Sequence, residues 1–149
     1  MLYYLLFPLH TEIGLLNVIQ YITFRTAAAS LTAFIVSLIF GPIVIKWLHV
    51  LQIKQVVRED GPATHSAKAG TPTMGGLLIL GAALIPTLLW ADLTNEYVWL
   101  AVLSTIGFGA IGFVDDYLKI ARETPKGLSA SMKLCAQGLV ALAVGFALM

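Results

Sequence analysis

The stretch that decides the fold is residues 97–114, YVWLAVLSTIGFGAIGFV, which contains no charged residue and leads directly into Asp115 and Asp116. A membrane-spanning helix needs about 20 predominantly apolar residues, so this run predicts a helix that crosses a bilayer. Carboxylates are costly beside hydrocarbon, and two adjacent carboxylates also repel each other. The pair therefore indicates a function, and a metal ion or a cationic substrate group would offset its charge.

The composition of the whole chain agrees with a membrane protein. Of its 149 residues, 58% are hydrophobic and only 11% are charged, whereas soluble domains carry about 25% charged residues. We predict an all-α fold, a polytopic transmembrane helix bundle whose four spans cover residues 26–45, 74–91, 97–114 and 134–149. Two long loops, 46–73 and 115–133, would then lie on one side, and a tight hairpin turn at 92–95 on the other.

Basic residues are concentrated in the two long loops. Eight of the nine Lys and Arg residues lie there, and the hairpin turn has none. By the positive-inside rule, both loops face the cytoplasm, and Asp115 and Asp116 face it with them. An aromatic belt at the opposite interface is predicted from the residues that flank the hairpin turn, which are Trp90, Tyr97 and Trp99.

The two ends of the chain follow less regular patterns. Residues 1–25 are predicted to be a periplasmic or interfacial segment, with a helix lying on the membrane surface over Thr11–Phe24. A partial extra span is the alternative. The last span, 134–149, would reach about 24 Å, short of a hydrocarbon core of about 30 Å. We therefore expect the chain to be a fragment of a larger membrane protein.

The first loop ends in QVVREDGPATHSAKAGTPTMGG, residues 55–76. Thr71 or Thr73 is expected to cap the helix that follows, and the N-terminus of this helix beside Lys68 would suit a phosphate group. The two glycines that close the motif would let a ligand or another helix approach closely. The alternative is a capped helix start next to a basic, lipid-contacting loop.

The second loop reads DDYLKIARETPKGLSASMK, residues 115–133. If the preceding span ends here, the negative end of its dipole coincides with the two carboxylates, which is unfavourable. Lys119 and Lys126 could neutralise the pair. The other reading is a divalent cation such as Mg²⁺, which commonly uses one or two carboxylates together with substrate phosphates. Adjacent helix residues diverge by about 100°, so one ion would need a further ligand. The fourth span begins near Lys133.

Two features inside the spans concern helix packing. Pro86 is expected to kink the second span. The kink is tolerated because neighbouring helices can satisfy the backbone groups that it frees. Three glycines make the third span thin enough for close packing against other helices: Gly107, Gly109 and Gly112.

Three motifs carry a family resemblance. DGPATHSAKAGTPTMGG, GFVDDYLK and TPKGL, with the later Lys133, closely resemble the phospho-N-acetylmuramoyl-pentapeptide transferases, which belong to the polyprenyl-phosphate sugar-phosphate transferases. The resemblance runs from about Tyr21 to the end of the chain. It implies transfer of phospho-MurNAc-pentapeptide from UDP-MurNAc-pentapeptide to undecaprenyl phosphate, which gives lipid I and UMP. This step of peptidoglycan synthesis serves cell wall biogenesis, cell shape and cell division.

The resemblance also implies a site and its partners. Asp115 and Asp116 would be the catalytic and magnesium-binding residues. The substrate-binding residues would be Lys68, Thr73, Lys119, Lys126 and Lys133. The enzyme would use Mg²⁺, act at the cytoplasmic face of the bacterial inner membrane, and contact the nucleotide donor, the lipid acceptor and the bilayer. A homodimer is left open, and no nucleic-acid partner is expected.

The resemblance further implies a longer protein. Family members cross the membrane about ten times and carry an Asn/Asp-rich nucleotide motif, a further aspartate and a histidine pair that this sequence lacks. We therefore expect the chain to be an N-terminal fragment that is inactive alone. Two alternatives remain: a sister transferase that uses UDP-GlcNAc, and a non-catalytic membrane scaffold or transporter segment.

Overall fold

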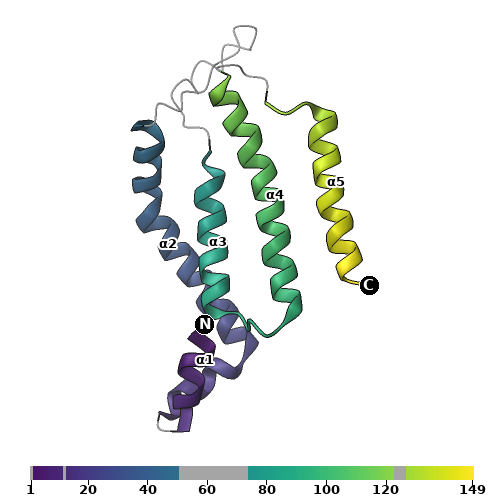
Figure 1. Ribbon diagram of the computed structural model, residues 1–149. Helices are drawn as coiled ribbons and strands as arrows, with labels where there is room; N and C mark the ends of the chain where they lie inside the picture. The colour runs from purple at the N-terminus through teal and green to yellow at the C-terminus, as the bar shows by residue number, and fades with distance from the viewer. Residues whose placement is uncertain (1, 12, 51–73, 123–126) are drawn as a thin grey trace.

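The computed structural model describes residues 2–11, 13–50, 74–122 and 127–149, and within these ranges every regular element is helical. A short N-terminal segment is followed by four longer helices (Figure 1). The elements are α1 (Leu2–Leu6), the 3-10 helices η1 (Phe7–Thr11) and η2 (Gly14–Gln20), α2 (Ile22–Val50), α3 (Gly76–Trp90), α4 (Glu96–Ala121) and α5 (Ala130–Ala147).

The four longer helices stand side by side in chain order. Helix α2 packs on α3, α3 on α4, and α4 on α5, whereas α2 and α5 do not pack on each other. The end of α2, the start of α3, the end of α4 and the start of α5 lie at one end of the bundle, which is uppermost in Figure 1. We call this the loop end. The turn between α3 and α4 lies at the other end, which we call the hairpin end.

The predicted all-α membrane bundle is confirmed. Helices α2, α4 and α5 are long and apolar enough to cross a bilayer, while α3, with 15 residues, is apolar but shorter. Large hydrophobic side chains remain exposed along these helices, and Phe146 keeps 82% of its surface accessible. Exposed apolar surface on this scale suits contact with lipid or with further helices. The positions at which each helix enters and leaves the bilayer stay predictions.

Glycine sets the spacing of two helix contacts. A Cβ atom added to Gly109 would lie 2.5 Å from Cδ1 of Leu80, and one added to Gly107 would lie 3.1 Å from Cγ1 of Val140. Helix α4 therefore approaches α3 and α5 through these glycines, as predicted for a thin third span. Gly112 differs, because a Cβ there would meet nothing within 4 Å.

Polar contacts close the turn at the hairpin end. The Asn95 side chain caps α4 by accepting a 2.9 Å hydrogen bond from the backbone N–H of Tyr97. Trp99 donates its indole N–H to the Leu93 carbonyl at 2.8 Å. Trp90, at the end of α3, donates to Thr32 Oγ1 of α2 at 3.1 Å. The aromatic residues predicted to form a belt therefore all lie at this end.

The N-terminal segment differs from the helix expected over Thr11–Phe24. That prediction is wrong, because η2 ends at Gln20 and the extended backbone of Tyr21 separates it from α2. Stacked rings hold the preceding segment in a compact arrangement, with Phe7 stacked on both Tyr3 and His10. The segment thus uses local aromatic contacts in place of one amphipathic face.

Two predictions about α3 stay untested by the described residues. Gly75 is the N-cap of α3, and the threonine cap stays a prediction. Thr71 and Thr73 lie outside the described residues. Pro86 is buried inside α3, which continues to Trp90, and the predicted kink stays a prediction.

Candidate functional site

The two adjacent aspartates lie within a helix. They were expected in a loop that begins at residue 115, but α4 continues to Ala121, so the position of its end was predicted wrongly. The reason is apolar packing beyond the uncharged run. Ile120, near the end of α4, packs against a small buried cluster formed by Leu48 of α2 and Met74. Burial of this side chain favours another helical turn past the carboxylates.

Asp115 is enclosed by hydrogen-bond donors. Its Oδ2 atom accepts from Nζ of Lys119 at 2.8 Å and from Nζ of Lys133 at 2.9 Å, and its Oδ1 atom accepts from the backbone N–H of Leu128 at 2.9 Å. Only 9% of its side chain is exposed. Both oxygens are therefore satisfied by the protein, which offsets the cost of burying the charge. The Asp115 carboxylate joins α4 to the start of α5.

Asp116 has a more open environment. Its Oδ1 atom accepts from Nζ of Lys119 at 2.9 Å, and 32% of its side chain is exposed. Lys119, one helical turn further along α4, thus contacts both carboxylates, at spacings of three and four residues. The salt bridging predicted for Lys119 is confirmed. The pair is unequal, since Asp115 is held by three donors and Asp116 keeps access to a ligand.

Gly127 brings the chain close to Asp115. A Cβ atom at this position would lie 2.8 Å from the Asp115 carbonyl oxygen and 2.9 Å from its Cγ, and closer still to Oδ1. Any side chain would therefore displace the carboxylate or the segment that donates to it. Ser129 follows as the N-cap of α5, and its hydroxyl accepts from the N–H of Met132 at 3.3 Å. This cap positions Lys133 within the first turns of α5.

Backbone conformation also shapes the start of α3. Met74 has a φ of 70°, in the left-handed region that non-glycine residues seldom adopt, and its side chain is buried against Leu48. The turn at Met74 directs the chain into α3 at the loop end. Among the described residues, a Cβ atom at Gly75 or Gly76 would meet nothing within 4 Å, and the approach of a ligand to the start of α3 stays a prediction.

A cavity of about 300 Å³ lies between the first turns of α3 and the second half of α4. Asp115 and Asp116 line its polar end, while Leu77, Leu80 and Phe113 are among its apolar walls. An apolar cleft that ends at charged groups suits an amphiphilic ligand with a polar head at the aspartates.

The described residues offer an incomplete set of metal ligands. Within the ranges that the structure covers, no group of three or more His, Cys, Asp or Glu side chains converges. Both oxygens of Asp115 are already engaged, which leaves Asp116 as the carboxylate that fits a cation better. A single carboxylate agrees with Mg²⁺, which often takes few protein ligands and completes its shell with water and substrate phosphates.

The predicted site residues are brought together in part. Lys119 and Lys133 converge on the aspartates, whereas Lys68, Thr73 and Lys126 lie outside the described residues. The prediction missed the roles of two residues in the TPKGL motif: the close approach of Gly127 and the N–H group of Leu128. The glycine of that motif was the only sequence signal of a close approach by the backbone to another group.

Comparison with known proteins gives a consistent result. The first signature of phospho-N-acetylmuramoyl-pentapeptide-transferase matches residues 68–80. Curated proteins of that name are 54% identical over 97% of the chain in Pelobacter propionicus and 57% identical over 95% in Desulfatibacillum aliphaticivorans. A third, from Koribacter versatilis, is 53% identical over 99% of the chain.

The match covers only part of these relatives. The chain spans about 40% of the length of the curated proteins that it resembles, and it corresponds to their N-terminal part. Within that part the identity to these three relatives is 53–57%, and the signature lies at residues 68–80. The chain therefore resembles the N-terminal part of the phospho-N-acetylmuramoyl-pentapeptide-transferases and carries the first signature of that family.

Proposed function

We propose that the full-length protein transfers phospho-MurNAc-pentapeptide from UDP-MurNAc-pentapeptide to undecaprenyl phosphate, which yields lipid I and UMP. The observation that carries this proposal is a sequence identity of 54%, over nearly the whole chain, to a curated phospho-N-acetylmuramoyl-pentapeptide-transferase. The aspartates and lysines at the loop end agree with it, because they provide charges that suit phosphate groups beside apolar walls.

The reaction is an exchange at phosphorus. An oxygen of the lipid phosphate attacks the phosphorus that carries the sugar, a new pyrophosphate bond forms, and the bond to UMP breaks. UMP leaves with the electron pair. Catalysis of such transfers depends on alignment and on neutralisation of negative charge. The protein therefore needs cations that are held in place before the substrates arrive.

Lys119 and Lys133 are the cations proposed for this role. Each ammonium group lies 2.8–2.9 Å from an oxygen of Asp115, which fixes its position. The side chains stay partly accessible, with 34% of Lys119 and 39% of Lys133 exposed. Their remaining N–H groups are available to phosphate oxygens. In this proposal Asp115 is a positioning residue that acts through the two lysines and through the turn at Gly127.

Asp116 is the carboxylate proposed to face the reactants. Its greater exposure suits it to hold Mg²⁺ together with pyrophosphate oxygens of the donor, and the ion would supply further neutralisation of charge. Lys68, Thr73 and Lys126 are proposed substrate contacts. They rest on the family resemblance, because they lie outside the described residues.

The location follows the distribution of charge. We place the loop end at the cytoplasmic face of the inner membrane, because the lysines of the site gather there and the turn at the hairpin end has no basic residue. The cytoplasmic side is also where a water-soluble nucleotide donor is available. In this arrangement the enzyme carries out the first membrane step of peptidoglycan synthesis.

The test is substitution of each aspartate in the full-length protein. We expect Asp116→Asn to lower UMP release by about 100-fold or more while the protein still inserts and folds. Asp115→Asn should lower both turnover and thermal stability, because it loosens both lysines. Glu96→Gln, at the exposed start of the same helix, is the matched control and should keep its activity. Near-normal turnover in both aspartate variants would refute the site.

A second experiment tests the choice of donor. Purified full-length protein should release UMP with UDP-MurNAc-pentapeptide and not with UDP-GlcNAc. The reverse preference would assign the protein to the sister transferases, and no release with either donor would favour a scaffold. Residues 1–149 alone should release no UMP with either donor, and detectable release would contradict the expectation that the chain is inactive by itself.

A further inference from the structure

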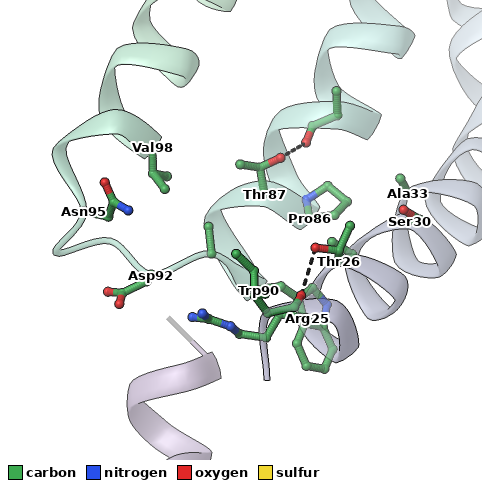
Figure 2. Close-up of a pocket in the computed structure, with 14 residues that line it drawn as sticks. Arg25, Thr26, Ser30, Ala33, Pro86, Thr87, Trp90, Asp92, Asn95 and Val98 are labelled. Carbon is green, nitrogen blue, oxygen red and sulfur yellow. Dashed lines mark hydrogen bonds between the residues drawn. The ribbon is translucent and has the colours of Figure 1, made fainter. Parts of the chain in front are cut away.

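A second and larger cavity lies at the hairpin end, far from the aspartates. It has a volume of about 500 Å³ and lies between the first turns of α2 and the second half of α3 (Figure 2). Its lining includes Ala29 and Ala33 of α2 and Pro86 of α3. Among the described residues of the lining, Arg25, in the first turn of α2, is the only cationic one and Asp92 the only anionic one.

The polar groups on the cavity wall are largely satisfied by their own neighbours. Thr26 donates its hydroxyl to the Ile22 carbonyl at 2.9 Å, and Thr87 donates to the Ala83 carbonyl at 2.7 Å. The indole N–H of Trp90 is engaged by Thr32 of α2. With these donors used within or between the helices, the wall offers mostly carbon to a ligand, and it suits an apolar chain.

Arg25 is different, because part of its guanidinium group is buried without a partner. Within the described residues, neither Nε nor Nη1 has a hydrogen-bond partner, and both atoms are inaccessible to solvent. The guanidinium carbon lies 4.7 Å from the centre of the Tyr3 ring, a cation–π contact that positions the group but satisfies neither N–H. Figure 2 shows the guanidinium extending toward the side of the cavity where Asp92 and Asn95 lie.

Asp92 does not serve as that partner. It forms no ion pair with Arg25 within 4.0 Å, and its Oδ1 atom is occupied by the hydroxyl of Tyr4 and by the N–H and hydroxyl of Thr94. These neutral donors engage the Oδ1 atom of Asp92, and Arg25 acts on this carboxylate only through charge, without a direct ion pair. A buried guanidinium N–H without an acceptor is unfavourable, and no described residue at this end of the cavity accepts a hydrogen bond from Nε or Nη1 of Arg25.

We propose that this cavity binds an anionic phospholipid, with an acyl chain between α2 and α3 and the phosphate group on Arg25. The apolar wall and Arg25, which has no ion pair within the part of the chain that the structure describes, match an amphiphile with one negative charge. The predicted aromatic belt at the hairpin end, formed by Trp90, Tyr97 and Trp99, marks the depth at which lipid headgroups lie. The site is separate from the aspartate pair, and it stands whether or not the proposed transferase activity is correct.

Lipid retention by the full-length protein in detergent tests the site, with native mass spectrometry as the readout. Phosphatidylglycerol should be retained in preference to phosphatidylcholine, which has no net charge. Arg25→Gln should weaken retention of phosphatidylglycerol roughly tenfold or more, because a charged phosphate would lose its ionic partner. Lys46→Gln, which removes an exposed cation from the other end of α2, is the matched control and should retain the lipid.

A second variant keeps the test decisive if Arg25→Gln fails to fold. Ala33→Leu fills the apolar part of the cavity and leaves Arg25 in place, so it should also reduce retention roughly tenfold. Unchanged retention in either folded variant, or equal retention of the two lipids, would overturn the proposal. Displacement of the lipid by millimolar inorganic phosphate would overturn the lipid assignment and identify a free anion as the ligand.

Discussion

The two ends of the bundle handle charge in different ways. At the loop end, two aspartates meet two lysines, and one carboxylate is almost fully enclosed by N–H groups. At the hairpin end, the carboxylate of Asp92 is satisfied by neutral donors, while part of the Arg25 guanidinium stays buried and unpaired. One end is thus a prearranged cluster of ion pairs, and the other holds a cation that forms no ion pair with any described residue. We therefore propose two unlike phosphate sites in the same fold.

The largest expected effect, on the rate of UMP release, comes from removing the lysine that contacts both aspartates. Lys119→Met in the full-length protein removes the only described cation that contacts both aspartates, so UMP release should fall by about 100-fold to 1000-fold. Lys46→Met removes an exposed cation from α2 at the same end and should change release by less than about twofold. Equal losses in the two variants would mean that total charge matters and the cluster geometry does not.

The next effect tests how closely the cluster is positioned. Gly127→Ala introduces a Cβ atom against Asp115 and should lower UMP release by about 10-fold to 100-fold, because the lysines move with the carboxylate. Gly138→Ala, in α5, is the matched control, since a Cβ there meets nothing within 4 Å and alanine favours helix. Activity of Gly127→Ala equal to that of the control would show that the close approach is unimportant.

A smaller effect, on the free energy of unfolding, is expected at the contact between Gly109 of α4 and Leu80 of α3. Gly109→Ala should destabilise the protein by about 1–3 kcal/mol, because its Cβ atom would overlap with Leu80 on α3. Gly112→Ala adds the same methyl group one helical turn away into open space and should stay within about 0.5 kcal/mol of the parent. Unfolding of both variants in detergent, followed by circular dichroism, measures the difference. Similar stabilities would contradict the packing described for α3 and α4.

The smallest effect is expected at Asp92. Hydrogen bonds from Tyr4 and then Thr94 lower the pKa of Asp92 from 3.8 to about 2. Because the folded-state pKa lies below the ordinary value, this carboxylate stabilises the fold above pH 3.8, and the contribution is lost as the pH falls through about 2. Tyr4→Phe should move the pKa back toward 3.8, as measured by carboxyl NMR on aspartate-labelled protein. An unchanged pKa would show that the Tyr4 hydroxyl contributes little.

Much of the fold follows from apolar runs in the sequence, whereas helix ends do not. The uncharged run up to Val114 predicts a span, but α4 continues to Ala121 because Ile120 finds a buried neighbour in Leu48, more than 70 residues earlier in the chain. The N-terminal segment shows the same limit. Its ring contacts are local, but they lie over residues 3–10, ahead of the residues 11–24 whose spacing predicted the helix.

The candidate site was predictable in kind, and only partly in geometry. Sequence identifies Asp115 and Asp116 as unusual because a carboxylate pair beside a long apolar run is costly. It does not tell which aspartate turns inward, because that depends on where Lys133 and the N–H of Leu128 arrive from α5 and its preceding turn. Arg25 gave no such signal, since a lone basic residue near a span is ordinary and its missing partner is visible only in three dimensions.

The placement of Lys119 has a consequence for the biosynthesis of the protein. If α4 enters the bilayer before α5 has left the ribosome, Lys133 cannot neutralise Asp115 at that stage. Lys119 lies four residues from Asp115 on the same helix, and their ion pair needs only the local helical turn. The helix can therefore be inserted with its acidic end already compensated. The contact with Lys133 then forms when α5 follows, and it joins two consecutively inserted helices at one face of the membrane.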